Sequence, residues 1–133
     1  MTRENFPISP ITDFRPPTIR LVPMAGFLVS ATAESSSAAV FFEIPDSVDL
    51  FRVRRLNVVN TTGTAASLSI SAVPSSASIG VQYREISALN VPGNDAIDVT
   101  DFIGGLYEKN TTLRVWSGTG SSLVVKGYGE HII

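Results

Sequence analysis

The segment that most constrains the fold of this chain is residues 51–73, where apolar and polar residues alternate over much of the length. In residues 67–72, serine alternates with leucine, isoleucine and alanine, a period-two pattern typical of a strand with one buried and one exposed face. The turn-prone run at 60–63 divides the segment, which predicts a β-hairpin. The apolar parity changes between Val53 and Leu56, and this change predicts a β-bulge.

Short segments of the same kind, separated by turn-forming residues, occupy most of the remaining chain. Residues 101–105 are expected to form a single helical turn or a loop, because two adjacent glycines disfavour a longer helix. The last two predicted strands are expected to form a closing hairpin. The pattern predicts an all-β chain, a single jelly-roll-like β-sandwich of about eight strands. Besides the first hairpin, the predicted strands are 27–32, 40–44, 80–89, 96–99, 112–116 and 122–128.

The N-terminal region, residues 1–25, contains five of the eight prolines. Proline fixes φ, removes a donor and favours an extended predecessor, so an extended arm is expected here, followed by a β-sandwich domain over 26–133. The arm is also rich in apolar residues, which could pack along their own domain or on a neighbouring subunit. The interface candidates in this region are Phe6, Ile8, Ile11, Phe14, Ile19 and Leu21.

Composition excludes several classes of function. Charged residues make up 17% of the 133 residues and the formal net charge is -2, so no basic field is expected to attract nucleic acid or an anionic membrane. The chain has no cysteine, which excludes disulfides, thiolate metal sites and a cysteine nucleophile. No apolar run is long enough for a membrane span and no secretory signal is evident, so synthesis in a cytoplasm is expected.

Few residues suggest catalysis or metal binding. His131 is the single histidine and has no partners at the spacing of a zinc or general-base site, so a surface or edge-strand histidine is expected. Asp95, Asp98 and Asp101 could bind calcium, but they lack the dense spacing of a calcium loop and are expected in a solvated loop. We therefore expect no enzymatic activity and no cofactor.

Arg52, Arg54 and Arg55 form the densest basic cluster of the chain. On a strand, Arg52 and Arg54 share a face and can contact carboxylates. Nucleic-acid binding would require more charge with interleaved aromatic residues. A salt-bridging face, within the domain or across a subunit interface, is the favoured interpretation, and the three arginines join the interface candidates.

Aromatic residues allow a second functional hypothesis. Trp116, Tyr107 and Tyr128, together with Tyr83, could form a stacking platform for a sugar ring. The same residues are equally suited to packing in a core or an interface. The alternative to an interaction protein is therefore a carbohydrate-binding module that uses Trp116, Tyr107 and Tyr128.

Two stretches carry a resemblance to a known group of proteins. These are VRRLNVVNTTGTAASLSISAV, which begins at residue 53, and GLYEKNTTLRVWSGTGSSLVVKGYGEHI, which begins at residue 105. They resemble the opening and closing hairpins of small structural proteins from tailed-bacteriophage virions, over residues 40–131, leaving the arm outside.

The resemblance implies a β-sandwich that assembles as a homo-oligomer on the virion and has no active site. It could serve as a capsid decoration or cement protein, a head-fibre base, or a neck or tail component. The implied partners are the major capsid protein or neighbouring head or tail subunits, and a homotrimer is expected because decoration proteins often lie on three-fold axes. The implied location is the virion, after synthesis in the host cytoplasm.

Overall fold

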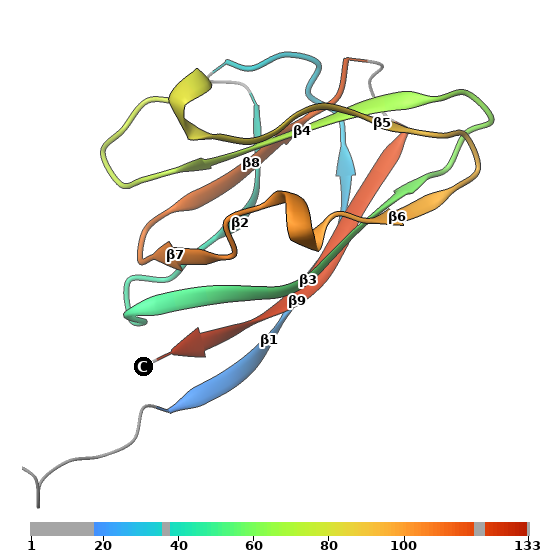
Figure 1. Ribbon diagram of the computed structural model, residues 1–133. Helices are drawn as coiled ribbons and strands as arrows, with labels where there is room; N and C mark the ends of the chain where they lie inside the picture. Colours follow the sequence, from blue (N-terminus) through green and yellow to red (C-terminus); the bar gives the residue numbers. More distant parts are fainter. Residues whose placement is uncertain (1–17, 36–37, 119–121, 133) are drawn as a thin grey trace, which may run out of the picture.

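The computed structural model describes residues 18–35, 38–118 and 122–132, and over these residues it is a sandwich of two antiparallel sheets (Figure 1). The predicted all-β sandwich is thus confirmed. Two single-turn 3-10 helices, η2 (Val81–Tyr83) and η3 (Thr100–Phe102), lie between strands, and no helix of the described chain is long and apolar enough to cross a membrane.

Sheet A contains, in spatial order, β1 (Ile19–Val29), β9 (Leu123–Ile132), β3 (Leu50–Asn60) and β6 (Ala96–Asp98), with β7 (Leu106–Glu108) also paired to β3. Sheet B contains β2 (Ala39–Glu43), β8 (Thr112–Trp116), β4 (Ala66–Val73) and β5 (Arg84–Val91).

The strand order is that of a jelly roll. Strands pair as nested partners, β1 with β9, β2 with β8, β3 with β6 and β7, and β4 with β5. Strands β6 and β7 pair with residues 57–59 and 50–52 of β3, so together they act as one interrupted strand. Counted in this way, the eight strands form the two four-stranded sheets of the jelly-roll pattern.

Two hairpins were predicted between strands that follow each other in the sequence, and both are wrong. Strand β3 lies in sheet A and β4 in sheet B, so residues 61–65 cross between the sheets instead of closing a hairpin. Strands β8 and β9 are likewise divided between the two sheets. The reason is that period-two alternation marks a half-buried strand but carries no information about its partner. The hairpin partner of β4 is β5.

The first cross-sheet connection is held by the side chain of Asn60, which is buried. Its amide nitrogen donates to the carbonyl oxygens of Thr64 (2.8 Å) and Val91 (3.1 Å). Its oxygen accepts from the backbone N–H and the hydroxyl of Thr62, both at 3.0 Å. One asparagine thus ties the end of β3 to the end of β5 and shapes the crossing.

The sandwich begins earlier in the chain than expected. Strand β1 starts at Ile19, so residues 19–25 belong to the folded domain and the boundary predicted after residue 25 is wrong. Pro23 lies inside β1, which is possible because an edge strand tolerates a residue that cannot donate a backbone hydrogen bond. The arm candidates Phe6, Ile8, Ile11 and Phe14 lie outside the described residues.

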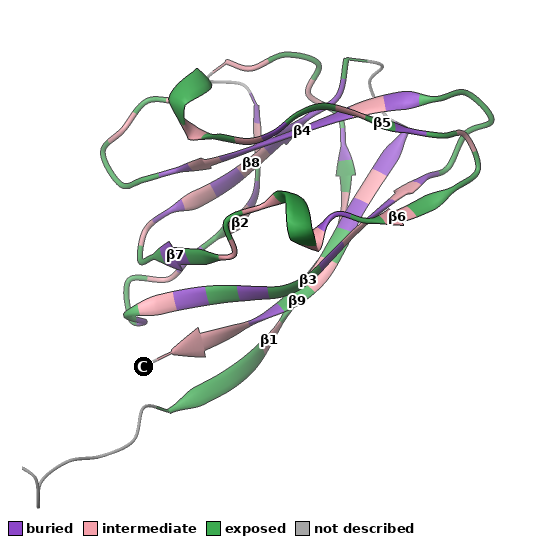
Figure 2. Cartoon of the chain, in the orientation of Figure 1, coloured by how far each residue is buried: buried purple, intermediate pink, exposed green. Residues whose placement is uncertain are grey.

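The core fills the space between the sheets, where Figure 2 shows buried segments on the inner strands. Its largest fully buried side chains include Phe51, Met24 and Leu56 of sheet A and Leu68 and Ile70 of sheet B. The predicted bulge in β3 is confirmed, because its register against β9 shifts between Val53 and Arg55. The shift lets Arg54 and Arg55 both remain exposed, while Val53 and Leu56 are both buried.

The serine face predicted for β4 is not exposed. Ser69 and Ser71 are buried, although they alternate with inward-facing apolar residues. Strand β4 is central in sheet B, and its outward-facing residues are flanked by Trp116 of β8 and Arg84 of β5. The sequence pattern predicted the inner face correctly and failed for the outer one, because neighbouring side chains cover it.

Candidate functional site

The surface most suited to a partner is the face of sheet A that points away from sheet B, which we call the outer face of sheet A. Strand pairing aligns its residues in rows across β1, β9 and β3. Each row joins an apolar residue of β1 to an arginine of β3 through a residue of β9. The rows are Leu21, Glu130 and Arg52, followed by Pro23, Tyr128 and Arg55.

Large apolar side chains on this face are exposed. Leu21 is 66% exposed, Ile19 57%, Leu28 52% and the ring of Tyr128 43%. Three of the four lie on β1, which is drawn as exposed over much of its length in Figure 2. Single exposed apolar residues are common, but several on one strand at the edge of a sheet indicate a contact surface. Ile19 and Leu21 were interface candidates, whereas Leu28 was missed because it lies in a segment predicted only as a strand.

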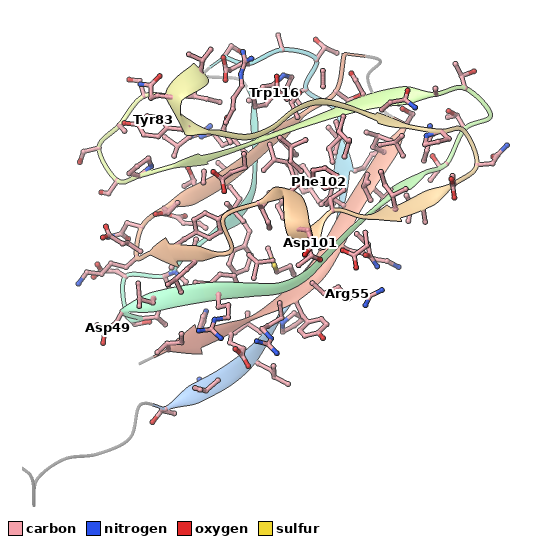
Figure 3. All side chains as sticks on the ribbon, in the orientation of Figure 1. Asp49, Arg55, Tyr83, Asp101, Phe102 and Trp116 are labelled. Carbon is pink, nitrogen blue, oxygen red and sulfur yellow. The ribbon has the colours of Figure 1, made fainter. Side chains whose placement is uncertain are left out.

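The arginine cluster lies on the same face. Arg54 is 4.0 Å from a carboxylate oxygen of Glu130, and Arg55 is 3.8 Å from Asp98. Figure 3 shows the side chain of Arg55 directed away from the sandwich. Arg54 and Arg55 thus form ion pairs within the domain, one of the two predicted alternatives, while Arg52 has no ion pair within the described chain. Exposed pairs at these distances contribute little to stability, so the arginines remain available to a partner.

Asp95, Asp98 and Asp101 were weighed as calcium ligands and expected in a solvated loop, and two of them, Asp95 and Asp98, have local structural roles. Asp98 accepts hydrogen bonds from the hydroxyl (2.5 Å) and the backbone N–H (2.9 Å) of Thr100, and these bonds, with the charge of Arg55, lower the pKa of its carboxyl. Asp95 accepts from the backbone N–H of Ala96 at 2.8 Å. Asp101 lies in η3 (Figure 3), and the described residues contain no cluster of three metal-ligating side chains.

The aromatic residues of the carbohydrate hypothesis do not share a surface. Tyr128 lies on sheet A, whereas Trp116 lies on β8 of sheet B and is buried. The guanidinium carbon of Arg84 lies 5.9 Å from the centre of the Trp116 ring, and Arg84 is held by Glu34 through bonds of 2.8 and 2.9 Å. Trp116, which Figure 3 places in sheet B, therefore packs beside the Arg84–Glu34 ion pair and does not present its face to a sugar.

Tyr107, the third of these aromatic residues, is buried on β7, where it closes one side of the sandwich. Its hydroxyl donates to Glu85 of β5 at 2.8 Å, and the same carboxylate oxygen accepts from the backbone N–H of Gly104 at 2.5 Å. Burial and the negative charge of Glu85 raise the pKa of the Tyr107 phenol. The contact links β7, at an edge of sheet A, to β5, at an edge of sheet B. No feature of the sequence predicted it.

A second feature that the sequence did not reveal is a hollow of about 460 Å³ beside sheet B. Arg114 of β8 lines it and donates to the carbonyl oxygen of Ala38 at 3.0 Å, while its buried Nε has no partner among the described residues. The lining comes from two loops and a strand far apart in the chain, which explains why no motif predicted it. The lining residues are Glu34, Ser35, Ala77, Ser78, Ile79 and Arg114.

His131 was expected at the surface or on an edge strand. The edge strand is wrong, because His131 lies on β9 between β1 and β3. Its ring is half-buried and packs edge-on against Phe51, with 5.5 Å between the ring centres. Burial, followed by the charge of Arg20, lowers the pKa of its imidazole. The residue therefore has a packing role at the end of sheet A.

No family model, curated protein or solved structure matches the chain. The class of protein is accordingly defined by the fold, a jelly-roll β-sandwich whose first strand forms an exposed apolar edge.

Proposed function

We propose that the chain is a non-enzymatic structural protein of a tailed-bacteriophage virion, a capsid decoration or cement protein. It assembles as a homo-oligomer and contacts other virion subunits through its N-terminal arm and the outer face of sheet A. The observation that carries this proposal is the exposed apolar side of β1, where Ile19 and Leu21 are 57% and 66% exposed. This strand directly follows the arm, whose first 17 residues contain further apolar side chains.

The composition of the outer face of sheet A supports an interaction role. Arginine and tyrosine are enriched where protein interfaces bind most tightly, because each combines a large contact area with specific polar bonds. Arg52, Arg55 and Tyr128 lie in adjacent rows with Leu21. A stable interface buries about 1,600 Å² in total, and repetition over many symmetric copies multiplies its effect on a shell.

The second candidate is a neck, tail or head-fibre component, which would use the same surface. The sequence resemblance applies equally to virion proteins at these positions. A carbohydrate-binding role has less support, because Trp116 and Tyr107 are buried and lie apart from Tyr128.

The virion role is tested on purified particles of a phage that carries the gene. Mass spectrometry of density-banded particles should detect the chain in many copies, and an antibody against it should label the heads. Labelling of necks or tails would favour the second candidate. Complete absence from intact particles would contradict a virion role.

The arm is tested by deleting residues 1–17, a cut chosen because β1 begins at Ile19 and must be retained. Light scattering coupled to size exclusion gives the mass of the full chain and of the shortened chain, and binding to particles that lack the protein gives attachment. The shortened chain should keep the circular dichroism spectrum of a β-sandwich and lose attachment. Attachment at full affinity would show that the arm is dispensable.

A further inference from the structure

We propose that β1 is a self-association edge, which pairs antiparallel with β1 of a second copy about a two-fold axis at Leu21. The two copies of sheet A then form one continuous sheet. This inference deepens the proposed function, on which it rests, by naming a second copy of this chain as the first partner of the arm and of β1.

Strand β1 is the sheet edge best suited to accept another strand. It is 11 residues long and pairs with β9 on one side, while no described strand pairs with its other side. An edge of this length presents unpaired N–H and C=O groups, which natural proteins normally cover, shorten or distort. The first six residues of β1 are regular against β9, because its register shift comes after Met24.

The other edges of the described sheets are short or distorted. Strands β6 and β7 have three residues each, and β2 has five with a register shift between Val40 and Phe42. Strand β5 contains Ala88 in left-handed backbone (φ 53°) and has irregular register against β4. These features hinder strand addition at those edges. The register of β1 is regular over residues 19–24, and its Pro23, which has no backbone N–H, removes one hydrogen bond on each side of the two-fold axis.

This difference between edges favours a two-fold axis. A two-fold contact joins the same edge of both copies, whereas a ring of three must join β1 to a different edge. The other edges are poor partners, so the edge geometry favours a dimer over the homotrimer expected from resemblance. Six copies remain compatible, if such dimers associate through another surface.

The side chains determine the register of the seam, by which we mean the antiparallel pairing of β1 with β1 of the second copy. Ile19, Leu21 and Pro23 share one face of β1, since alternate residues of a strand point the same way. An axis at Leu21 places Leu21 opposite its equivalent and Ile19 opposite Pro23 of the second copy, so exposed apolar residues contact one another. An axis at Arg20 would instead place two like charges directly opposite, which is destabilising.

The arm supplies the remaining contact area. In an antiparallel seam, the arm of each copy leaves β1 at residue 18 and runs towards the Val29 end of the second copy's β1. Seventeen residues reach up to about 58 Å, and the 11 residues of β1 span about 36 Å. With the axis at Leu21, residues 19–23 of the two copies pair with each other, so the 17 preceding residues are long enough to reach past the rest of the partner strand, residues 24–29, where Leu28 is 52% exposed.

The absence of cysteine gives a sharp test. Directly opposed residues of an antiparallel pair have Cα atoms roughly 4.5–5.5 Å apart, within the range of a disulfide. Under mild oxidation, full-length Leu21→Cys should form a disulfide-linked dimer, seen as a band at twice the 14.2 kDa chain mass on non-reducing gels. Ile19→Cys should not, because an axis at Leu21 separates the two copies of residue 19 by about four residues, or ~14 Å.

Val81→Cys is the matched control, because Val81 is 67% exposed but lies in η2, next to sheet B. Equal yields from Leu21→Cys and Val81→Cys would reflect random collision and would overturn the proposal. Faster crosslinking of Ile19→Cys than of Leu21→Cys would overturn the register and with it the two-fold axis at Leu21.

A second measurement does not depend on cysteine chemistry. Light scattering should give the full chain twice the mass of one chain, and Leu21→Asp should reduce it to the monomer mass, while Val81→Asp stays dimeric. Circular dichroism confirms that each variant is folded. A stable trimer with no Leu21 crosslink would overturn the β1 seam and leave the virion role intact. A Leu21-crosslinked dimer that is absent from virions would support the seam and contradict the virion role.

Discussion

Gly129 of β9 lies against the ring of Phe51 of β3 so closely that a Cβ atom on the glycine would be 2.3 Å from the ring Cζ. The ring occupies the space that a side chain on β9 would need. Gly127, two residues earlier, meets the backbone oxygen of Arg55 in a similar way. The Gly-Tyr-Gly sequence therefore lets β9 pass close to the core beside the bulge of β3.

Substitution of Gly129 by alanine should destabilise the fold by about 1–3 kcal/mol, because overpacking forces the Phe51 ring or the backbone to move. Urea denaturation followed by tryptophan fluorescence measures the change. Gly26→Ala is the matched control in sheet A, since its Cβ would be 3.6 Å from Val124, an ordinary contact. A Gly129→Ala chain as stable as the wild type would show that the ring can shift at no cost.

Asn60→Ala should destabilise the fold by about 1–3 kcal/mol, because it leaves carbonyl groups at the cross-sheet connection without their donors. The affected groups are those of Thr64 and Val91. Asn90→Ala, at an exposed position on β5, should leave the midpoint of chemical denaturation nearly unchanged. Equal effects of the two substitutions would contradict a special role for Asn60.

The Tyr107–Glu85 contact predicts alkaline instability. The raised pKa of Tyr107 means that its neutral form is favoured in the folded state, so this contribution is complete below the usual tyrosine pKa of 10.0 and is lost as pH rises above it. Stability measured at pH 8 and at pH 11 should fall more for the wild type than for Tyr107→Phe, which cannot ionise. Parallel declines of both chains would show that Tyr107 does not determine the effect.

The carboxyl of Asp98 should titrate below the ordinary range of aspartate, because Thr100 donates two hydrogen bonds to its charged form. The lowered pKa means that this contribution is present above the unfolded-state pKa and is lost as pH falls through the folded-state value. NMR titration of the carboxyl carbons measures this. Thr100→Ser keeps the hydroxyl and should keep the low pKa, whereas Thr100→Val should raise it.

Local pattern was sufficient to predict the all-β class, the bulge in β3 and the positions of β2, β6 and β8, because alternation and turn residues act over a few positions. It was insufficient for strand pairing. Strand β9 pairs with β1 and β3, far away in the sequence, and nothing in the alternation of β8 and β9 distinguishes a hairpin from a crossing between sheets.

The candidate site was predicted in part for the same reason. Ile19, Leu21 and the three arginines were found because their chemistry is visible residue by residue. Their alignment into rows with Tyr128 depends on the pairing of β9 with both neighbours, which no local signal contains. Trp116 was proposed as a binding residue, and its burial beside the Arg84–Glu34 pair depends on three distant segments.

The central position of β9 in sheet A has a consequence for protein synthesis. Strands β1 and β3 flank β9, so neither has its main partner until β9 has left the ribosome. During translation, β1 and β3 expose apolar faces and unpaired edges, the features that make incomplete chains prone to aggregation. Ribosome stalling before Leu123 should yield a chain that recruits chaperones, and emergence of the ten residues of β9 should complete sheet A in one step.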